Sequence, residues 1–206
     1  MKLGKILTIS VLLLAPVVAR AGATIELFNG KNLDGWHAVL DPKSAAKPED
    51  TFGVRNGVLT VSGQPFGYIY TAAKYADYRL HIEWRWIEKP SNSGVFLFVQ
   101  EPKFWPNSIE CQLQSGRAGD FIKMGGSGIE PAPGRENLAR AGESNENPVG
   151  EWNNADLICE GNTISVFING EFKNRGVSAQ NNNGHIALQS EGGPLEFRNI
   201  RLTPLK

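Results

Sequence analysis

The chain has 206 residues, enough for one domain with a hydrophobic core. Its 21 basic and 21 acidic side chains cancel, so its charge gives no indication of nucleic-acid binding. Hydrophobic residues make up 41% of the chain and charged residues 20%, a composition that excludes a disordered protein.

The N-terminal residues have the three-part layout of a secretory signal peptide. Lys2 and Lys5 precede an apolar run over residues 6–18, and Ala19-Arg20-Ala21 supplies small residues at the two positions that a signal peptidase reads. The run is short for a membrane span, although an uncleaved anchor is the alternative interpretation. We therefore expect a signal peptide at residues 1–21, one domain at 22–206, and a periplasmic or secreted protein without a transmembrane anchor.

Most segments after the signal peptide alternate between apolar and polar residues, which is typical of half-buried β-strands. The clearest is 78–87, where Tyr, Leu, Ile and Trp residues alternate with Arg, His and Glu. Residues 109–114 and 163–168 alternate in the same way, whereas 95–99 is apolar on both faces. The pattern predicts antiparallel strands around a shared core.

Turn residues separate these strands. Asn56-Gly57 and Asn169-Gly170 each lie between two strand-like runs, and such pairs favour two-residue hairpin turns because Asn and Gly tolerate positive φ. Many short strands with tight turns predict an all-β sandwich.

Residues 115–150 are rich in Gly, Pro, Asn and Glu, so we expect a long loop folded over one sheet, with mobile disorder as the alternative.

Several common functional signatures are missing from the sequence. It has no phosphate-binding glycine loop, dinucleotide fingerprint or nucleophile elbow. His37, His81 and His185 are too widely spaced to predict a zinc site. We expect no cofactor, and the sequence leaves calcium or another divalent ion open. Cys111 and Cys159 lie in apolar strands, where either free buried thiols or a disulfide bridge is consistent with the pattern.

Polar side chains recur in pairs on the predicted strand faces. Carboxylates, amides and guanidinium groups along a sheet suit a sugar, whose hydroxyls both donate and accept hydrogen bonds. The alternative is the solvated face of an antiparallel sheet. The pairs are Glu83 with Arg85, Glu110 with Gln112, and Gln189 with Glu191.

Glu110 is the strongest candidate for a catalytic base. It lies between two apolar residues and just before the long loop, and burial would raise its pKa toward the range useful for proton transfer.

Trp105 could line the pocket or pack in the core. His81 could act as an acid or base, and Lys123 could stabilise an oxyanion, although both residue types are more often structural or solvated.

Several strings in the chain occur together in one known family. They are Glu26-Leu27-Phe28-Asn29-Gly30-Lys31, Asn56-Gly57-Val58-Leu59, Glu83-Trp84-Arg85, Asn92-Ser93-Gly94-Val95-Phe96-Leu97, Ile109-Glu110-Cys111-Gln112-Leu113, Gly150-Glu151-Trp152-Asn153, Leu188-Gln189 and Glu196-Phe197-Arg198-Asn199-Ile200. Together they resemble the 3-keto-disaccharide hydrolase domain family from about residue 25 to the C-terminus. Phe98 and Glu191 depart from the family's pattern, which often has arginine and histidine at these positions.

The resemblance implies a concanavalin-like (LamG-like) jelly roll of two antiparallel sheets. It also implies cleavage of glycosides whose C3 hydroxyl has been oxidised to a ketone, either by hydrolysis or by C2 deprotonation, β-elimination and hydration. We expect Glu110 to act as the base, Arg85 or Lys123 to contact the ketone oxygen, and Glu83 or His81 to assist the leaving group. The residues expected to position sugar hydroxyls are Gln112, Asn153 and Gln189, with Glu191 and Trp105 as further substrate contacts.

Two other functions are consistent with the same residues. A non-catalytic carbohydrate-binding module would use the polar and aromatic side chains without turnover. A conventional glycosidase acting on unoxidised sugar would need two carboxylates across a cleft, for instance Glu83 with Glu110. In each case the expected partner is a small carbohydrate and not a nucleic acid. The sequence does not indicate an oligomeric state.

Overall fold

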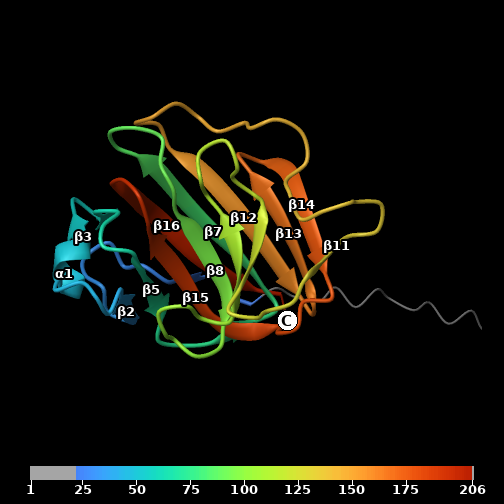
Figure 1. Cartoon of the computed structure of the whole chain (residues 1–206), viewed down its shortest axis with the longest axis horizontal. Coiled ribbons are helices and arrows are strands. Elements are labelled where there is room, and N and C mark those ends of the chain that lie inside the picture. Colours follow the sequence, from blue (N-terminus) through green and yellow to red (C-terminus); the bar gives the residue numbers. More distant parts are fainter. Residues whose placement is uncertain (1–21, 206) are drawn as a thin grey trace, which may run out of the picture.

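The computed structural model describes residues 22–205, so the expected signal peptide lies outside the described residues. The chain forms an all-β jelly-roll sandwich of two antiparallel sheets, as expected (Figure 1). Within residues 22–205 the one helix is the short α1 (Pro48–Thr51), and no helix there is long and apolar enough to cross a membrane.

The larger sheet has nine strands. In spatial order they are β11 (Glu130–Pro131), β14 (Glu171–Val177), β13 (Thr163–Ile168), β12 (Asn153–Glu160), β7 (Tyr78–Trp86), β16 (Leu195–Pro204), β4 (Val58–Val61) and β3 (Phe52–Arg55), with β1 (Ile25–Glu26) paired to β16. In Figure 1 this sheet runs from β3 at one end of the molecule to β11 at the other.

The smaller sheet has seven strands and packs against the larger one. In spatial order they are β10 (Phe121–Met124), β9 (Ser108–Gln112), β8 (Gly94–Val99), β15 (Asn183–Ser190), β5 (Gly67–Thr71) and β2 (Trp36–Leu40), with β6 (Tyr75–Ala76) paired to β15. Neighbouring strands within each sheet are often distant in sequence, which is typical of a jelly roll.

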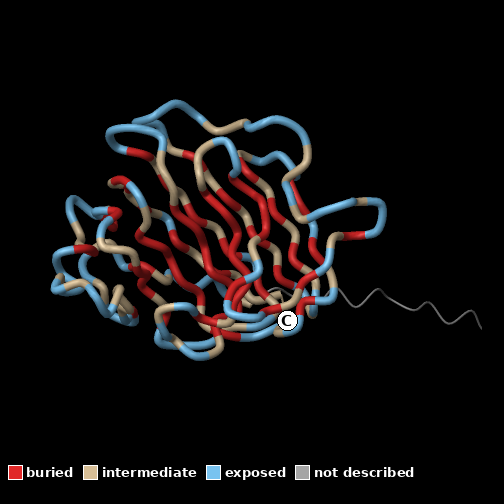
Figure 2. Tube along the Cα trace, in the orientation of Figure 1, coloured by how far each residue is buried: buried red, intermediate tan, exposed pale blue. Residues whose placement is uncertain are grey.

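The core lies between the sheets and follows the alternation of the sequence. Leu80, Ile82 and Trp84 of β7 are fully buried in one cluster with Leu97 of β8 and Cys111 of β9. Figure 2 shows the alternation as buried positions interrupted by less buried ones along the strands. Burying each large apolar side chain stabilises the fold by roughly 1.5–3 kcal/mol. Cys111 and Cys159 are both buried and free, so the structure contains thiols at these positions.

Both predicted hairpin turns are confirmed. Asn56 and Gly57 have φ of 52° and 79° between β3 and β4, and Asn169 and Gly170 have φ of 49° and 79° between β13 and β14. These positive angles suit the type I′ turn, whose twist matches that of the flanking strands.

The segment 115–150 differs from the predicted structureless loop. It contains β10, which extends the smaller sheet beside β9, and β11, which extends the larger sheet beside β14. Phe121 and Ile129 from this segment are buried in the core cluster. The segment therefore closes one side of the sandwich, and only its remaining residues form irregular loops. The short strands escaped prediction because β10 has four residues and β11 has two, too few for a clear period.

Candidate functional site

The structure separates the predicted site residues into two groups on opposite sides of the sandwich. Ile109 and Cys111 face the core, so Glu110 between them faces outward from the smaller sheet. Ile82 and Trp84 also face the core, so Glu83 between them faces outward from the larger sheet. The prediction that these carboxylates converge in one cavity is therefore wrong. His81 and Arg85 share the face of Glu83 and are likewise separated from Glu110.

On the larger sheet, ion pairs satisfy the predicted polar residues. The Nε of Arg198 donates to Glu83 at 2.7 Å, and the Nε of Arg85 donates to Glu196 at 2.7 Å. The two guanidinium groups lie over the ring of Trp152, at 4.6 Å for Arg85 and 4.0 Å for Arg198. This arrangement corresponds to the alternative considered from the sequence, a solvated sheet face, and it leaves no role for these groups in chemistry at Glu110.

Glu110 lies in a confined position on β9. Its side chain lies against Gly94 of β8, where an added Cβ would lie 2.1 Å from the Oε1 of Glu110. The side chain of Glu110 therefore occupies the space that any other residue at position 94 would fill. The residue is 5% exposed, and its buried Oε1 has no hydrogen-bond partner in the described structure. A buried carboxylate oxygen without a partner is costly and often marks a functional site.

Glu110 borders a cavity of about 350 Å³ on the outer face of the smaller sheet. The volume is in the range typical of small-molecule sites. The cavity brings together five of the predicted residues: Trp105, Glu110, Lys123, Gln189 and Glu191. Its other lining residues are Phe66, Ile122, Met124 and Gly125.

Burial dominates the electrostatics of Glu110. The pKa of Glu110 is raised from 4.5 to about 8, chiefly by burial and also by the nearby charge of Glu191, while the charge of Arg117 partly opposes the rise. At neutral pH most of the Glu110 side chains are therefore protonated. When deprotonated, a carboxylate with this pKa is a stronger base than an ordinary glutamate.

Gln189 and Glu191 form the wall of the cavity next to β15. The Nε2 of Gln189 donates to the Oε2 of Glu191 at 2.8 Å, and the Oγ of Ser93 donates to the backbone carbonyl of Gln189 at 2.8 Å. Gln189 is 2% exposed, and its Oε1 has no partner in the described structure. The wall therefore holds a second carboxylate in a fixed position and contains a buried amide oxygen without a partner.

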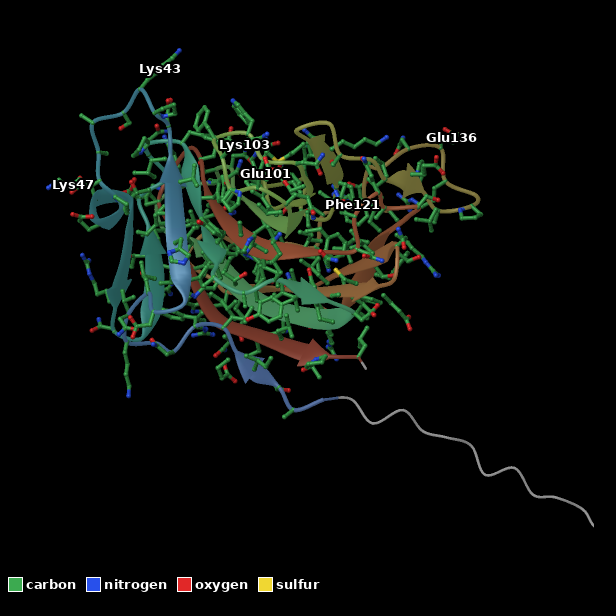
Figure 3. All side chains as sticks on the ribbon, turned by 90° about the horizontal axis from the view of Figure 1, so that it is seen from below. Lys43, Lys47, Glu101, Lys103, Phe121 and Glu136 are labelled. Atoms are coloured by element: carbon green, nitrogen blue, oxygen red, sulfur yellow. The ribbon has the colours of Figure 1, made fainter. Side chains whose placement is uncertain are left out.

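A loop over residues 100–107 covers part of the outer face of the smaller sheet. The hydroxyl of Tyr68 donates to the backbone carbonyl of Lys103 at 2.7 Å and fixes the loop to β5. Figure 3 shows Glu101 and Lys103 side by side on this loop. Trp105 packs against Phe66 with ring centroids 4.8 Å apart, yet it is 55% exposed. An exposed indole at a cavity rim can contact the C–H face of a sugar.

Lys123 borders the cavity from the edge strand β10. Its neighbours Ile122 and Met124 pack on the outer face of the smaller sheet, so alternation directs the Lys123 side chain to the other face of the strand. Lys123 is exposed. Its ammonium group would have to turn around the sheet edge to reach a ligand beside Glu110.

Two other predicted contacts have structural partners outside the cavity. The Oε1 of Gln112 accepts from the backbone N–H groups of the next two residues, at 3.0 and 2.9 Å. Asn153 belongs to the larger sheet, and its Oδ1 accepts from the backbone N–H of Asn147 and the side chain of Asn169. Gln112 shares the outward face of Glu110 on β9, so its contact with a substrate stays a prediction. Asn153 belongs to the other sheet and does not line the cavity beside Glu110.

Sequence reasoning did not identify Phe66, Ile122 and Met124 as cavity residues. Ile122 lies directly opposite Glu110 in the strand register, and Met124 lies on the same face of β10. Nothing in the local sequence indicates these contacts, because they depend on the pairing of β10 with β9. Among residues 22–205, no cluster of three or more His, Cys, Asp or Glu side chains could hold a metal ion.

The chain is similar to several proteins that are named for the cleavage or the binding of carbohydrates. The chain is 22% identical over 237 aligned residues to a 3-keto-disaccharide hydrolase of Bacteroides thetaiotaomicron, covering 90% of this chain and 79% of the relative. A Parabacteroides distasonis protein whose assignment as a glycosyl hydrolase is provisional has the same fold, with TM-score 0.67, 20% identity and coverage of 89% of this chain and 94% of that one. The carbohydrate-binding module CBM66 of Bacillus subtilis follows, with TM-score 0.55, 12% identity and coverage of 81% and 94%.

The sequence pattern of one family covers nearly the whole described chain. The match spans residues 23–203, from the segment before β1 into the last strand, β16. It includes both sheets and every residue of the cavity. The chain therefore belongs to the family of 3-keto-alpha-glucoside-1,2-lyase-like domains.

Proposed function

We propose that the protein cleaves the glycosidic bond of 3-keto-glycosides, with Glu110 removing the proton on C2. The observation that carries this proposal is the buried carboxyl group of Glu110, which borders the cavity. Its Oε1 has no hydrogen-bond partner in the described structure, and its pKa is raised to about 8. Family membership and the name of the Bacteroides relative support the sugar class.

The proposed reaction is a β-elimination. A ketone at C3 acidifies the C2 hydrogen; Glu110 takes that proton, and the C2–H electrons form an enediolate whose negative charge resides on the C3 oxygen. Collapse of the enediolate forms the C1–C2 double bond and breaks the bond from C1 to the leaving oxygen. Water can then add across the double bond to give the hydrolysis product. This route needs a base and stabilisation of developing charge, without an oxocarbenium ion.

The cavity suggests revised roles for the remaining groups. Glu191 is our candidate for protonating the leaving oxygen, in place of Glu83 and His81 on the opposite face. Lys123 remains the candidate for the ketone oxygen, in place of Arg85. Gln189 offers its free Oε1 to a sugar hydroxyl, and Trp105 offers its exposed ring.

The proposed cellular location follows the expected signal peptide. We infer that residues 1–21 are removed near Ala21 and that residues 22–206 act in the periplasm or outside the cell.

One substrate comparison tests the function. The protein should release 4-nitrophenol from 4-nitrophenyl glucoside only after its C3 hydroxyl has been oxidised. Release from the unoxidised glucoside would instead favour a conventional glycosidase using Glu110 and Glu191, the two carboxyl groups of the cavity. Binding of both compounds without any release would favour a carbohydrate-binding module, the function named for the CBM66 structure.

The pH dependence tests the contribution of Glu191. Because Glu110 must be deprotonated to act as a base, kcat/KM should rise with pH through about 8. Glu191→Gln removes a like charge beside Glu110, so the rise should move to lower pH. The 4-nitrophenyl leaving group needs no acid, so turnover of this substrate should persist in the variant. An unchanged midpoint would show that Glu191 does not act on Glu110.

A further inference from the structure

The outer face of the larger sheet carries a second hollow, on the opposite side of the sandwich from Glu110. It is a polar groove of about 330 Å³ formed by β7, β12, β16 and the segment before β1. Its lining residues are Thr24, Arg79, His81, Asp156, Arg201 and Thr203. None of them belongs to the cavity of the proposed reaction.

Most charges around this groove are already paired. The Oδ1 of Asp156 accepts from the Nε of Arg79 at 3.1 Å and is 3.0 Å from the Nδ1 of His81. Glu83 lies 3.8 Å from the Nε2 of His81 but is held by Arg198 at 2.7 Å. These contacts lower the pKa of both Asp156 and Glu83 despite their partial burial. The carboxylates near the groove are therefore ionised and have cationic partners.

Arg201 is the exception among the charged residues of this groove. Arg79, Arg85 and Arg198 each pair with a carboxylate, whereas within residues 22–205 no carboxylate oxygen lies within 4.0 Å of the Arg201 guanidinium. Glu26 is opposite Arg201 in the register of β1 and β16, yet the two do not form an ion pair. The groove thus contains a guanidinium group whose charge is not neutralised by a neighbour.

The donors around Arg201 suit a negatively charged oxygen group. Arg79 lines the same groove as Arg201 and donates its Nε to Asp156. Guanidinium donors match the planar or tetrahedral arrangement of oxyanion oxygens. The hydroxyls of Thr24 and Thr203, 2.9 Å apart, add two further polar groups at the same wall. We propose that this groove binds an oxyanion; the family's name, which refers to a glucoside, points to one carried by an acidic sugar, either a uronate carboxylate or a sulfate ester.

The proposal is tested by titrating the chain of residues 22–206 with sodium glucuronate, glucose 6-sulfate and glucose at constant ionic strength. The arginine Nε–H and His81 ring signals in ¹⁵N NMR report occupancy. Saturable shifts with one or both acidic sugars, and none with glucose, are expected, and the stronger ligand identifies the source of the oxyanion. Equal shifts with glucose, or no saturable shift with either acid, would overturn the proposal.

Variants locate the binding group. Arg201→Gln should weaken acidic-sugar binding about tenfold or more, because it removes a charge-assisted interaction. Arg201→Lys should retain part of the affinity through its charge. Arg55→Gln, a matched change at an exposed arginine of β3 in the same sheet, should bind as the wild type does. Turnover at Glu110 should be unchanged in all three variants, and wild-type binding by Arg201→Gln would contradict the assignment.

Discussion

Replacing Glu110 by glutamine is expected to reduce turnover of a 3-keto-glucoside by about 10²–10⁴-fold, the usual contribution of a positioned base. Glutamine has nearly the same shape as protonated glutamate, so it should fill the space above Gly94 without displacing β8. It cannot accept the C2 proton. The measurement is kcat and KM with the oxidised 4-nitrophenyl glucoside, and the loss should fall on kcat while the circular dichroism spectrum stays unchanged.

Glu83→Gln provides a matched control for this experiment. It makes the same chemical change on the opposite face of the sandwich, where Glu83 pairs with Arg198 and Asn199. The variant should keep near-wild-type turnover, because the loss of a partly exposed ion pair changes stability only slightly. Near-full activity of Glu110→Gln would remove Glu110 from the role of base. Loss of activity in Glu83→Gln would show that the opposite face takes part in the reaction.

The second large effect is on stability. The pKa of Glu110 is raised from 4.5 in the unfolded chain to about 8 in the folded protein. A group with a raised pKa contributes stability that is fully present below the unfolded value and is lost as the pH rises through the folded value. At about 1.4 kcal/mol per pH unit, ionising the buried Glu110 should lower the free energy of unfolding by roughly 5 kcal/mol between pH 4.5 and pH 8.

Glu110→Gln removes this pH dependence. The variant should have a free energy of unfolding close to that of the wild type near pH 5 and should be several kcal/mol more stable at pH 9. Urea denaturation of both proteins at pH 5, 7 and 9 gives the difference directly, since all other titrating groups are shared. If the difference between the two proteins is the same at all three pH values, the Glu110 carboxyl group has an ordinary pKa.

The strands and hairpins could be predicted because their signals are local. Alternation along residues 78–86 places Trp84 in the core and Glu83 outside it, and the same reasoning places Glu110 outward on β9. Asn-Gly pairs predicted two hairpins because the required positive φ depends on those two residues alone.

The assembly of the site could not be predicted in the same way. Alternation indicates that a residue faces away from the core, but it does not indicate which of two sheets carries the strand. Glu83 and Glu110 have the same local pattern, yet β7 joins the larger sheet and β9 the smaller one. Ile122 reaches the cavity through the pairing of β10 with β9, a contact that the glycine-rich sequence around it does not reveal.

The family resemblance suggests site residues, and the structure shows which of them lie together. The resemblance identified Glu110 and Gln189, and the structure places both at one cavity. It also suggested Arg85, which the structure places beside Trp152 on the other face. A motif can therefore mark a residue that stabilises the sandwich as readily as one that contacts substrate.

The most direct test of Glu110 as a base is a deuterium isotope effect at C2. The rate of cleavage should be measured with 3-keto-glucoside carrying hydrogen or deuterium at C2, using the wild-type protein at pH 8. If Glu110 removes the C2 proton in the step that limits cleavage, the deuterated substrate should react several-fold more slowly, and solvent deuterium should appear at C2 only when Glu110 is present. Equal rates for the two substrates, together with no solvent exchange at C2, would contradict the account.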